Sequence, residues 1–136
     1  MGTIIRTAHW FGVETLICSE QCVEIYNPKV VQAAMGSLFF VNVVQTGLEN
    51  FFSSLNKNLP VYGTVLNGKN IYESKLQSPA VVLLGNESTG ISEKLKPFIT
   101  HPVTIPSKIK KGIHQPDSLN VATAAAIVCA ELTRKH

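Results

Sequence analysis

Charge and long apolar runs are both scarce in this sequence. Of its 136 residues, 15% are charged and 45% are hydrophobic, and the formal net charge is +3. No stretch approaches the roughly 18 consecutive apolar residues that a membrane-spanning helix needs, and no signal-peptide pattern opens the chain. The small positive charge permits an anionic partner without indicating one. We therefore expect a globular protein with an ordinary hydrophobic core and no membrane partner.

Metal-binding and disulfide patterns are also missing from the sequence. The cysteines are odd in number and lack the paired spacing of a zinc site: Cys18, Cys22 and Cys129. The four histidines are scattered along the chain. We therefore expect reduced, mostly buried thiols in a cytoplasmic protein that holds no metal.

The common phosphate-binding motifs, G-x-x-x-x-G-K-[ST] and G-x-G-x-x-G, do not occur in the sequence. Instead, the apolar run 80–84 ends in a small polar loop over residues 85–92. Ser92 has the features of a helix N-cap, which predicts a helix over 93–98. A buried strand that leads into a polar loop is typical of ligand sites in α/β proteins. The one carboxylate of this loop, Glu87, lies where a ligand is expected.

Helix and strand patterns alternate along the rest of the chain. Apolar spacing predicts further helices near residues 4–11, 28–38, 50–55 and from about 118 onward, and strands over 13–18, 41–44, 60–66 and 102–105. Asn27-Pro28 has the features of a helix start, and Asn67-Gly68 is expected to end a strand with a turn. This alternation predicts an α/β fold with a mainly parallel sheet covered by helices on both faces. The irregular stretch 107–116, with Lys108, Lys110 and Lys111, is expected to be a basic loop.

Three stretches together resemble the SpoU/TrmH family, within the SPOUT superfamily of S-adenosylmethionine-dependent RNA methyltransferases. Residues 2–12 (GTIIRTAHWFG) resemble the family's first motif, and residues 84–92 (LGNESTGIS) resemble its second. Ile105-Pro106 with residues 118–125 (SLNVATAA) resembles the third, and residues 27–39 form a further run typical of the family. The motifs occur in the family's order and cover nearly the whole chain.

The resemblance implies methylation of a ribose 2′-hydroxyl of tRNA or rRNA, with S-adenosylmethionine as cofactor, by a cytoplasmic homodimer. It also implies a C-terminal deep trefoil knot, which general topology rules alone would not predict. Four residues match the family's catalytic positions: Arg6, Glu87, Ser118 and Asn120. By the same resemblance, cofactor contacts are expected from Leu66, Gly85, Asn86, Ile105, Pro106 and Leu119.

Two departures from the family pattern affect these expectations. The first motif normally begins with an asparagine six residues before the arginine, a position that would precede Met1. We therefore expect residues 1–136 to form a single, truncated methyltransferase domain that lacks the first strand and any RNA-binding extension. The stretch between Pro106 and Ser118 is also longer and more basic than the family's usual turn.

Several site residues have an alternative, purely structural interpretation. Arg6 could be a solvated cation on an amphipathic helix. Glu87 could hold its own loop through the loop amides or contact the substrate. Ser118 could be a helix cap, whereas Asn120, placed inside the predicted helix, is not readily explained by capping. Trp10 is expected in the core or in a dimer interface rather than under an RNA base.

The chemistry of the guanidinium group limits the role of Arg6. A guanidinium group holds its proton too tightly for a general-base role, so binding a phosphate or polarising the ribose hydroxyl is the more reasonable function. A second functional class stays open: a non-catalytic RNA-binding and dimerisation module with the same fold. A third hypothesis, methylation of a base, is disfavoured by the sequence Ser118-Leu119-Asn120.

Overall fold

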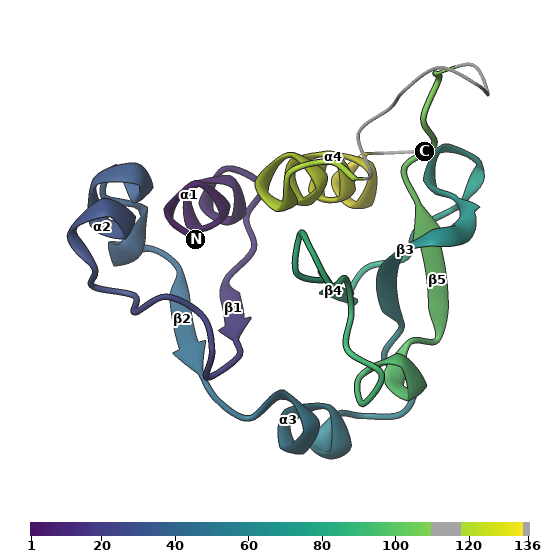
Figure 1. Ribbon diagram of the computed structural model, residues 1–136, viewed down its shortest axis with the longest axis horizontal. Helices are drawn as coiled ribbons and strands as arrows, with labels where there is room; N and C mark the ends of the chain where they lie inside the picture. Colours follow the sequence, from purple (N-terminus) through teal and green to yellow (C-terminus); the bar gives the residue numbers. More distant parts are fainter. Residues whose placement is uncertain (110–117, 135–136) are drawn as a thin grey trace. The chain divides into compact units, whose positions relative to one another are not determined.

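Parallel strand pairing organises both halves of the chain. The computed structural model describes residues 1–109 and 118–134, which fall into two compact units, Met1–Leu55 and Asn56–His136. Each unit contains its own sheet, and all strand pairs within these sheets are parallel (Figure 1). The predicted α/β class with parallel strands is confirmed. The single sheet is not, because the described strands form one two-stranded and one three-stranded sheet.

The first unit alternates helices with the strands of the two-stranded sheet. Its strands pair from Thr15 opposite Asn42 to Cys18 opposite Gln45, and they lie side by side in Figure 1. In chain order its elements are α1 (Gly2–Trp10), β1 (Thr15–Cys18), α2 (Pro28–Ala34), the 3-10 helix η1 (Ser37–Phe39), β2 (Asn42–Gln45) and α3 (Leu48–Ser54).

The core of the first unit forms between two helices and one face of its sheet. Its buried members come from α1, from α2 and from the residue just before β2: Ile5, Ala8, Val30, Ala34 and Val41. Leu16 and Val43, which are direct cross-strand partners, pack against this cluster. The helices approach closely because Gly2 has no side chain; a Cβ atom there would lie 2.4 Å from the carbonyl oxygen of Val30. Helices α1 and α2 therefore cover the same face of the sheet.

Helix α2 is shorter than the sequence predicts. Asn27 caps it as expected, since its side chain accepts a hydrogen bond from the backbone N–H of Lys29 (3.0 Å). The helix ends at Ala34, because Met35 and Gly36 both adopt left-handed backbone conformations, with φ of 49° and 81°. Left-handed residues stop an α-helix. The prediction of one continuous helical face reaching Leu38 was therefore wrong.

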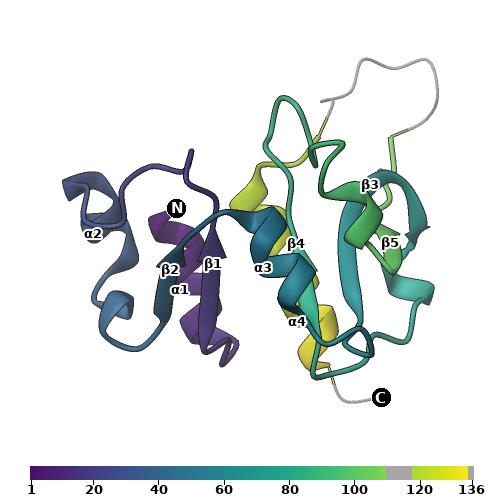
Figure 2. The same ribbon diagram turned by 90° about the horizontal axis from the view of Figure 1, so that it is seen from below.

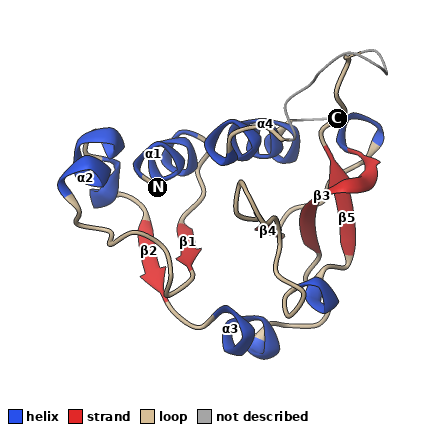
Figure 3. Cartoon of the chain, in the orientation of Figure 1, coloured by secondary structure: helices blue, strands red, loops and turns tan. Residues whose placement is uncertain are grey.

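The second unit carries the three-stranded sheet, in the order β4-β3-β5. Figure 2 shows α4 beside these strands, and Figure 3 separates helices from strands by colour. Val128 and Leu132 of α4 pack with Tyr62 and Val103 of the sheet, next to the fully buried Ile71. Its elements are β3 (Val61–Asn70), η2 (Ile71–Glu73), β4 (Val81–Leu83), η3 (Lys96–Phe98), β5 (His101–Thr104) and α4 (Val121–Thr133).

Strand β3 continues through the residues that were expected to form a turn. Thr64 and Lys69 both lie opposite Val103, so the four residues between them bulge out of the pairing. Gly68 makes this path possible: a Cβ atom there would lie 2.4 Å from the carbonyl carbon of Val103. The Asn67-Gly68 pair therefore serves a bulge with close backbone contact, not the end of a strand.

The predicted helix over residues 93–98 does not form. The backbone N–H groups of Leu95 and Lys96 donate to the carbonyl of Ser92 at 3.0 and 3.2 Å, which makes a single turn. The 3-10 helix η3 follows, with Pro97 inside it. Proline has no N–H to donate and clashes with the preceding turn. An α-helix starting at Glu93 would need that donor, so the chain adopts turns instead.

The three cysteines are free, and Cys18 is buried at the end of β1. Burial raises the pKa of the Cys18 thiol to about 11, with a smaller contribution from the nearby Cys22. Burial also raises the pKa of Cys129. None of the helices in the described part of the chain is long and apolar enough to cross a membrane.

Candidate ligand site at the carboxyl ends of the strands

Three predicted site segments follow the carboxyl ends of three neighbouring strands in the second unit. The bulge with Leu66 follows the first half of β3, the loop that starts at Gly85 follows β4, and Ile105-Pro106 follows β5. The strands are parallel and adjacent, so these segments share one edge of the sheet. The hydroxyl of Thr64 donates to the carbonyl of Leu83 (3.4 Å) and joins β3 to β4 at this edge. Such an edge is where open α/β sheets bind ligands.

The loop after β4 is closed by its own backbone. Asn86 and Gly90 exchange two hydrogen bonds, of 3.0 and 2.8 Å, between their backbone N–H and carbonyl groups. The side-chain oxygen of Asn86 accepts from the N–H and the hydroxyl of Ser88 (2.8 and 2.7 Å). Gly90 has a φ of +66°, and a Cβ atom on Gly85 would lie 2.4 Å from the carbonyl carbon of Gly90. The two glycines thus permit a tight loop that presents Glu87.

Glu87 contacts the start of α4, 33 residues farther along the chain. Its Oε1 accepts from Nδ2 of Asn120 at 2.5 Å and from the backbone N–H of Val121 at 3.1 Å. Its backbone carbonyl accepts from the hydroxyl of Ser118 at 3.4 Å. The residues that match the second and third motifs are therefore in direct contact. Glu87 thus forms hydrogen bonds with a distant segment of the chain. Neither of the two sequence interpretations of Glu87 specified this contact.

Asn120, not Ser118, is the N-cap of α4. Its Oδ1 accepts from the backbone N–H of Ala122 (2.9 Å), and the helix begins at Val121. The interpretation of Ser118 as the helix cap was therefore wrong, as was the inference that capping does not readily explain Asn120. Both ends of the Asn120 amide are engaged, one by the helix and the other by Glu87. Ser118 lies two residues before the cap, where its hydroxyl holds the Glu87 loop instead.

Arg6 and Trp10 lie on α1, in the first unit, and both side chains are exposed. The contacts that join Glu87, Ser118 and Asn120 do not include Arg6. Trp10 is 84% exposed, so the core alternative for this residue was wrong. In the expected basic loop, Lys108 is exposed, whereas Lys110 and Lys111 lie outside the described residues. Within residues 1–109 and 118–134, no group of three His, Cys, Asp or Glu side chains is suited to hold a metal ion.

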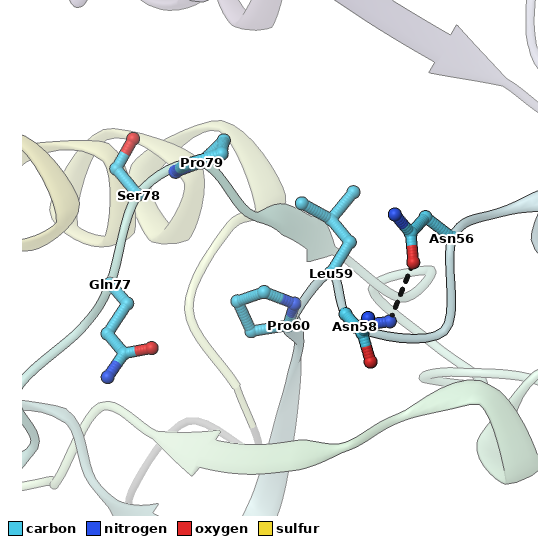
Figure 4. Close-up of a pocket in the computed structure, with 7 residues that line it drawn as sticks. All are labelled: Asn56, Asn58, Leu59, Pro60, Gln77, Ser78 and Pro79. Carbon is cyan, nitrogen blue, oxygen red and sulfur yellow. Dashed lines mark hydrogen bonds between the residues drawn. The ribbon is translucent and has the colours of Figure 1, made fainter.

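A separate hollow lies at the opposite, amino-terminal end of β3 and β4. It has a volume of about 370 Å³, and Figure 4 shows the residues around it: Asn56, Asn58, Leu59, Pro60, Gln77, Ser78 and Pro79. Pro60 directly precedes β3, and Pro79 lies two residues before β4. The hollow is therefore not the site at the carboxyl ends of the strands.

Sequence reasoning missed three groups that shape this site. They are the hydroxyl of Thr64, the backbone N–H of Val121 and the glycine at position 68. A glycine inside a strand pattern can signal a bulge, so Gly68 was detectable in principle. The other two depend on contacts between segments distant in sequence, and no local signal marks them.

Nearly the whole chain matches a known protein family. A family model described as the SpoU rRNA Methylase family matches residues 1–130. The chain is 32% identical over 134 residues to the 23S rRNA (guanosine(2553)-2′-O)-methyltransferase RlmP of Bacillus subtilis (strain 168). The matched region covers 97% of this chain and 52% of that protein. The chain spans about half the length of the curated relatives it matches.

Solved structures give a matching result for the fold. A TrmH-family protein from Porphyromonas gingivalis superimposes with a TM-score of 0.86 at 38% identity, over 96% of this chain and 53% of that one. An AdoMet-bound rRNA methyltransferase from Sinorhizobium meliloti does so with a TM-score of 0.83 at 29% identity, over 96% and 49%. The arrangement of helices and parallel strands is thus shared with proteins of this kind.

Proposed function

Because the chain belongs to the SpoU rRNA methylase family, we propose that it transfers the methyl group of S-adenosylmethionine to a ribose 2′-hydroxyl of tRNA or rRNA. The observation that carries this proposal is the contact of Glu87 with Asn120 and Val121. It joins residues of two sequence motifs at the ligand-binding edge of a parallel sheet. The activity named for the Bacillus subtilis relative, 2′-O-methylation of 23S rRNA, supports the same reaction class.

The edge described above has the chemistry to hold S-adenosylmethionine. Leu66 is 77% exposed and Leu119 47% exposed, which leaves apolar side chains open to a ligand. Flat heterocycles bind well where apolar surface and backbone donors and acceptors meet. Gly85 adds close backbone packing that a Cβ atom would block. We assign cofactor contacts to these segments: Leu66, Gly85, Asn86, Ile105, Pro106 and Leu119.

Bound at this edge, S-adenosylmethionine would supply a methyl group already activated by its sulfonium. The protein's own task is to orient the ribose, and positioning of this kind can lower a barrier by up to roughly 7–11 kcal/mol. Arg6 would bind an RNA phosphate or polarise the 2′-hydroxyl, because a guanidinium group is a cationic donor and not a proton acceptor. Ser118 would offer its hydroxyl oxygen to the substrate as a hydrogen-bond acceptor, since its proton is donated to the Glu87 carbonyl.

A surface of the first unit supports a homodimer. Four large side chains there are exposed, by 69% to 90%: Trp10, Met35, Phe39 and Phe40. His9 fixes η1 against α1. Its ring stacks on that of Phe40 with 4.6 Å between the ring centroids, and its Nδ1 lies 3.2 Å from the hydroxyl oxygen of Ser37. Residues 1–55 carry two basic and four acidic side chains, so apart from Arg6 this unit offers little positive charge to RNA phosphates. We assign this apolar surface to contact with a second copy of the chain.

Sedimentation analysis of the double variant Trp10→Ala/Phe39→Ala tests this surface. We expect the wild-type chain to sediment as a dimer and the variant as a monomer with an unchanged helix content. Tyr26, which is 82% exposed, provides a matched control through Tyr26→Ala. An unchanged dimer in the double variant would refute the assignment.

The family resemblance further supports a single domain with a deep trefoil knot at its C-terminal end.

Calorimetric titration with S-adenosylmethionine, followed by a methylation assay on RNA, tests the proposed activity. We expect saturable cofactor binding, and 2′-O-methylation that Arg6→Ala abolishes without changing cofactor affinity. Lys29→Ala removes the other cation of the first unit and serves as the control. A chain that binds RNA but never S-adenosylmethionine would instead be a non-catalytic module. Equal losses of binding and transfer in Arg6→Ala would reject the role given to Arg6.

A further inference from the structure

We propose that Glu87 is a positioning residue: its carboxylate fastens the start of α4 to the loop after β4, and thereby fixes Leu119 for cofactor binding. The carboxylate does not act on the RNA. The consequence for cofactor affinity rests on the proposed function, whereas the fastening itself does not.

The first observation is that α4 depends on Glu87 for a partner of its first turn. The first N–H groups of any α-helix lack partners within the helix. Asn120 satisfies the N–H of Ala122 at 2.9 Å, and Glu87 satisfies that of Val121 at 3.1 Å. A negative charge near a helix N-terminus is stabilising, yet the first turn of α4 contains no acidic residue. Glu87 supplies that charge from a different segment.

The second observation is that Glu87 stands on a rigid base. Two backbone hydrogen bonds between Asn86 and Gly90 close its loop, and the Asn86 side chain binds Ser88. The close packing of Gly85 on Gly90 leaves no space for a Cβ atom. A side chain on such a loop can fix a distant segment, because the loop itself has little freedom to move.

The third observation concerns Leu119, which lies between two residues tied to Glu87. The hydroxyl of Ser118 donates to the Glu87 carbonyl at 3.4 Å, and Nδ2 of Asn120 donates to its carboxylate at 2.5 Å. Leu119 is thus held from both sides, with its side chain 47% exposed. If these bonds are lost, Leu119 is free to leave its place, and the affinity for S-adenosylmethionine must fall. The turnover of the saturated enzyme should change little.

The experiment compares Glu87→Ala with Glu87→Gln in the full chain. Glutamine retains an oxygen that accepts from Val121 and Asn120, whereas alanine removes it. We expect Glu87→Ala to weaken the binding of S-adenosylmethionine about tenfold or more and to speed hydrogen exchange at the amide of Val121. Glu87→Gln should stay within about fivefold of the wild type in affinity and in kcat. Glu93→Ala, which removes an exposed carboxylate paired with Lys96, should behave as the wild type.

Two results would overturn the proposal. One is Glu87→Ala with unchanged exchange at Val121 and unchanged affinity. The other is Glu87→Gln with normal affinity but a loss of kcat of more than a hundredfold, which would place the carboxylate in the chemistry. If the wild-type chain does not bind S-adenosylmethionine, the proposed function fails. The hydrogen-exchange measurement at Val121 still tests whether Glu87 fastens the start of α4 to the loop after β4.

A further variant covers the case in which Glu87→Ala does not fold. Asn120→Ser keeps a capping oxygen on α4 but removes the Nδ2 donor to Glu87. We expect it to weaken cofactor binding about threefold or more while the helix content stays the same. Unchanged affinity in this variant would also contradict the proposal.

Discussion

Replacing Gly68 with alanine would place a methyl group where the backbone of β5 lies. The new Cβ atom would meet the carbonyl carbon of Val103 at 2.4 Å and its Cα and N atoms at 2.7 Å. Val103 is 2% exposed, at the centre of the second core, so its backbone cannot move away into solvent. Overpacking of this kind costs typically about 1–3 kcal/mol, and fixed backbone atoms favour the upper end of that range. Alanine regains up to about 1 kcal/mol over glycine inside a strand, which leaves a net loss of about 2 kcal/mol.

Urea denaturation followed by circular dichroism measures this loss. Gly47→Ala is the matched control, because the nearest atom to its new Cβ would be Nδ2 of Asn50 at 3.8 Å and its φ is an ordinary −66°. We expect Gly47→Ala to cost less than about 1 kcal/mol, as for a weakened helix cap. The path assigned to β3 is refuted if Gly68→Ala costs no more than Gly47→Ala. Since the bulge also carries Leu66, Gly68→Ala should bind S-adenosylmethionine more weakly.

Two further predictions concern pH and salt. The pKa of Cys18 rises from 9.0 to about 11 in the folded chain, so the thiol stays protonated there while the unfolded chain ionises. The contribution of this thiol to the free energy of unfolding is complete below pH 9 and is lost as the pH rises towards 11. Between pH 8 and pH 10.5, the urea midpoint should therefore drop more for the wild type than for Cys18→Ala. Equal drops would contradict this. Lys69 and Lys108 are exposed near the carboxyl ends of β3 and β5, so replacing either with alanine should reduce the salt slope of RNA binding by about 0.7–0.9. Lys57→Ala, beside the hollow at the opposite edge, should leave that slope unchanged, and equal slopes for all three variants would argue against phosphate contacts at the site edge.

Local signals in the sequence predicted much of the fold. The apolar spacing of α1, the Asn27-Pro28 start of α2 and the long C-terminal helix are all present in the structure. The alternation of element types predicted parallel strands, and the described sheets are parallel. These features depend on residues close together in the chain, which is why the sequence pattern contains them.

The errors arose where a local signal competes with a constraint from elsewhere. Ser92 has the composition of a helix cap, but Pro97 prevents an α-helix from forming after it. Asn67-Gly68 has the composition of a turn, but backbone contact with Val103 uses the glycine for a bulge. The roles of the site residues stay predictions, although the structure brings Glu87, Ser118 and Asn120 together.

The contact between Glu87 and Val121 also bears on how the protein is made. A ribosome adds Val121 only as the 34th residue after Glu87. During synthesis, the β4 loop therefore emerges well before the helix that completes it. A nascent chain without α4 would keep Glu87 but lack the groups that its carboxylate binds. Under the proposed function, cofactor binding would therefore require α4 to have docked against the β4 loop.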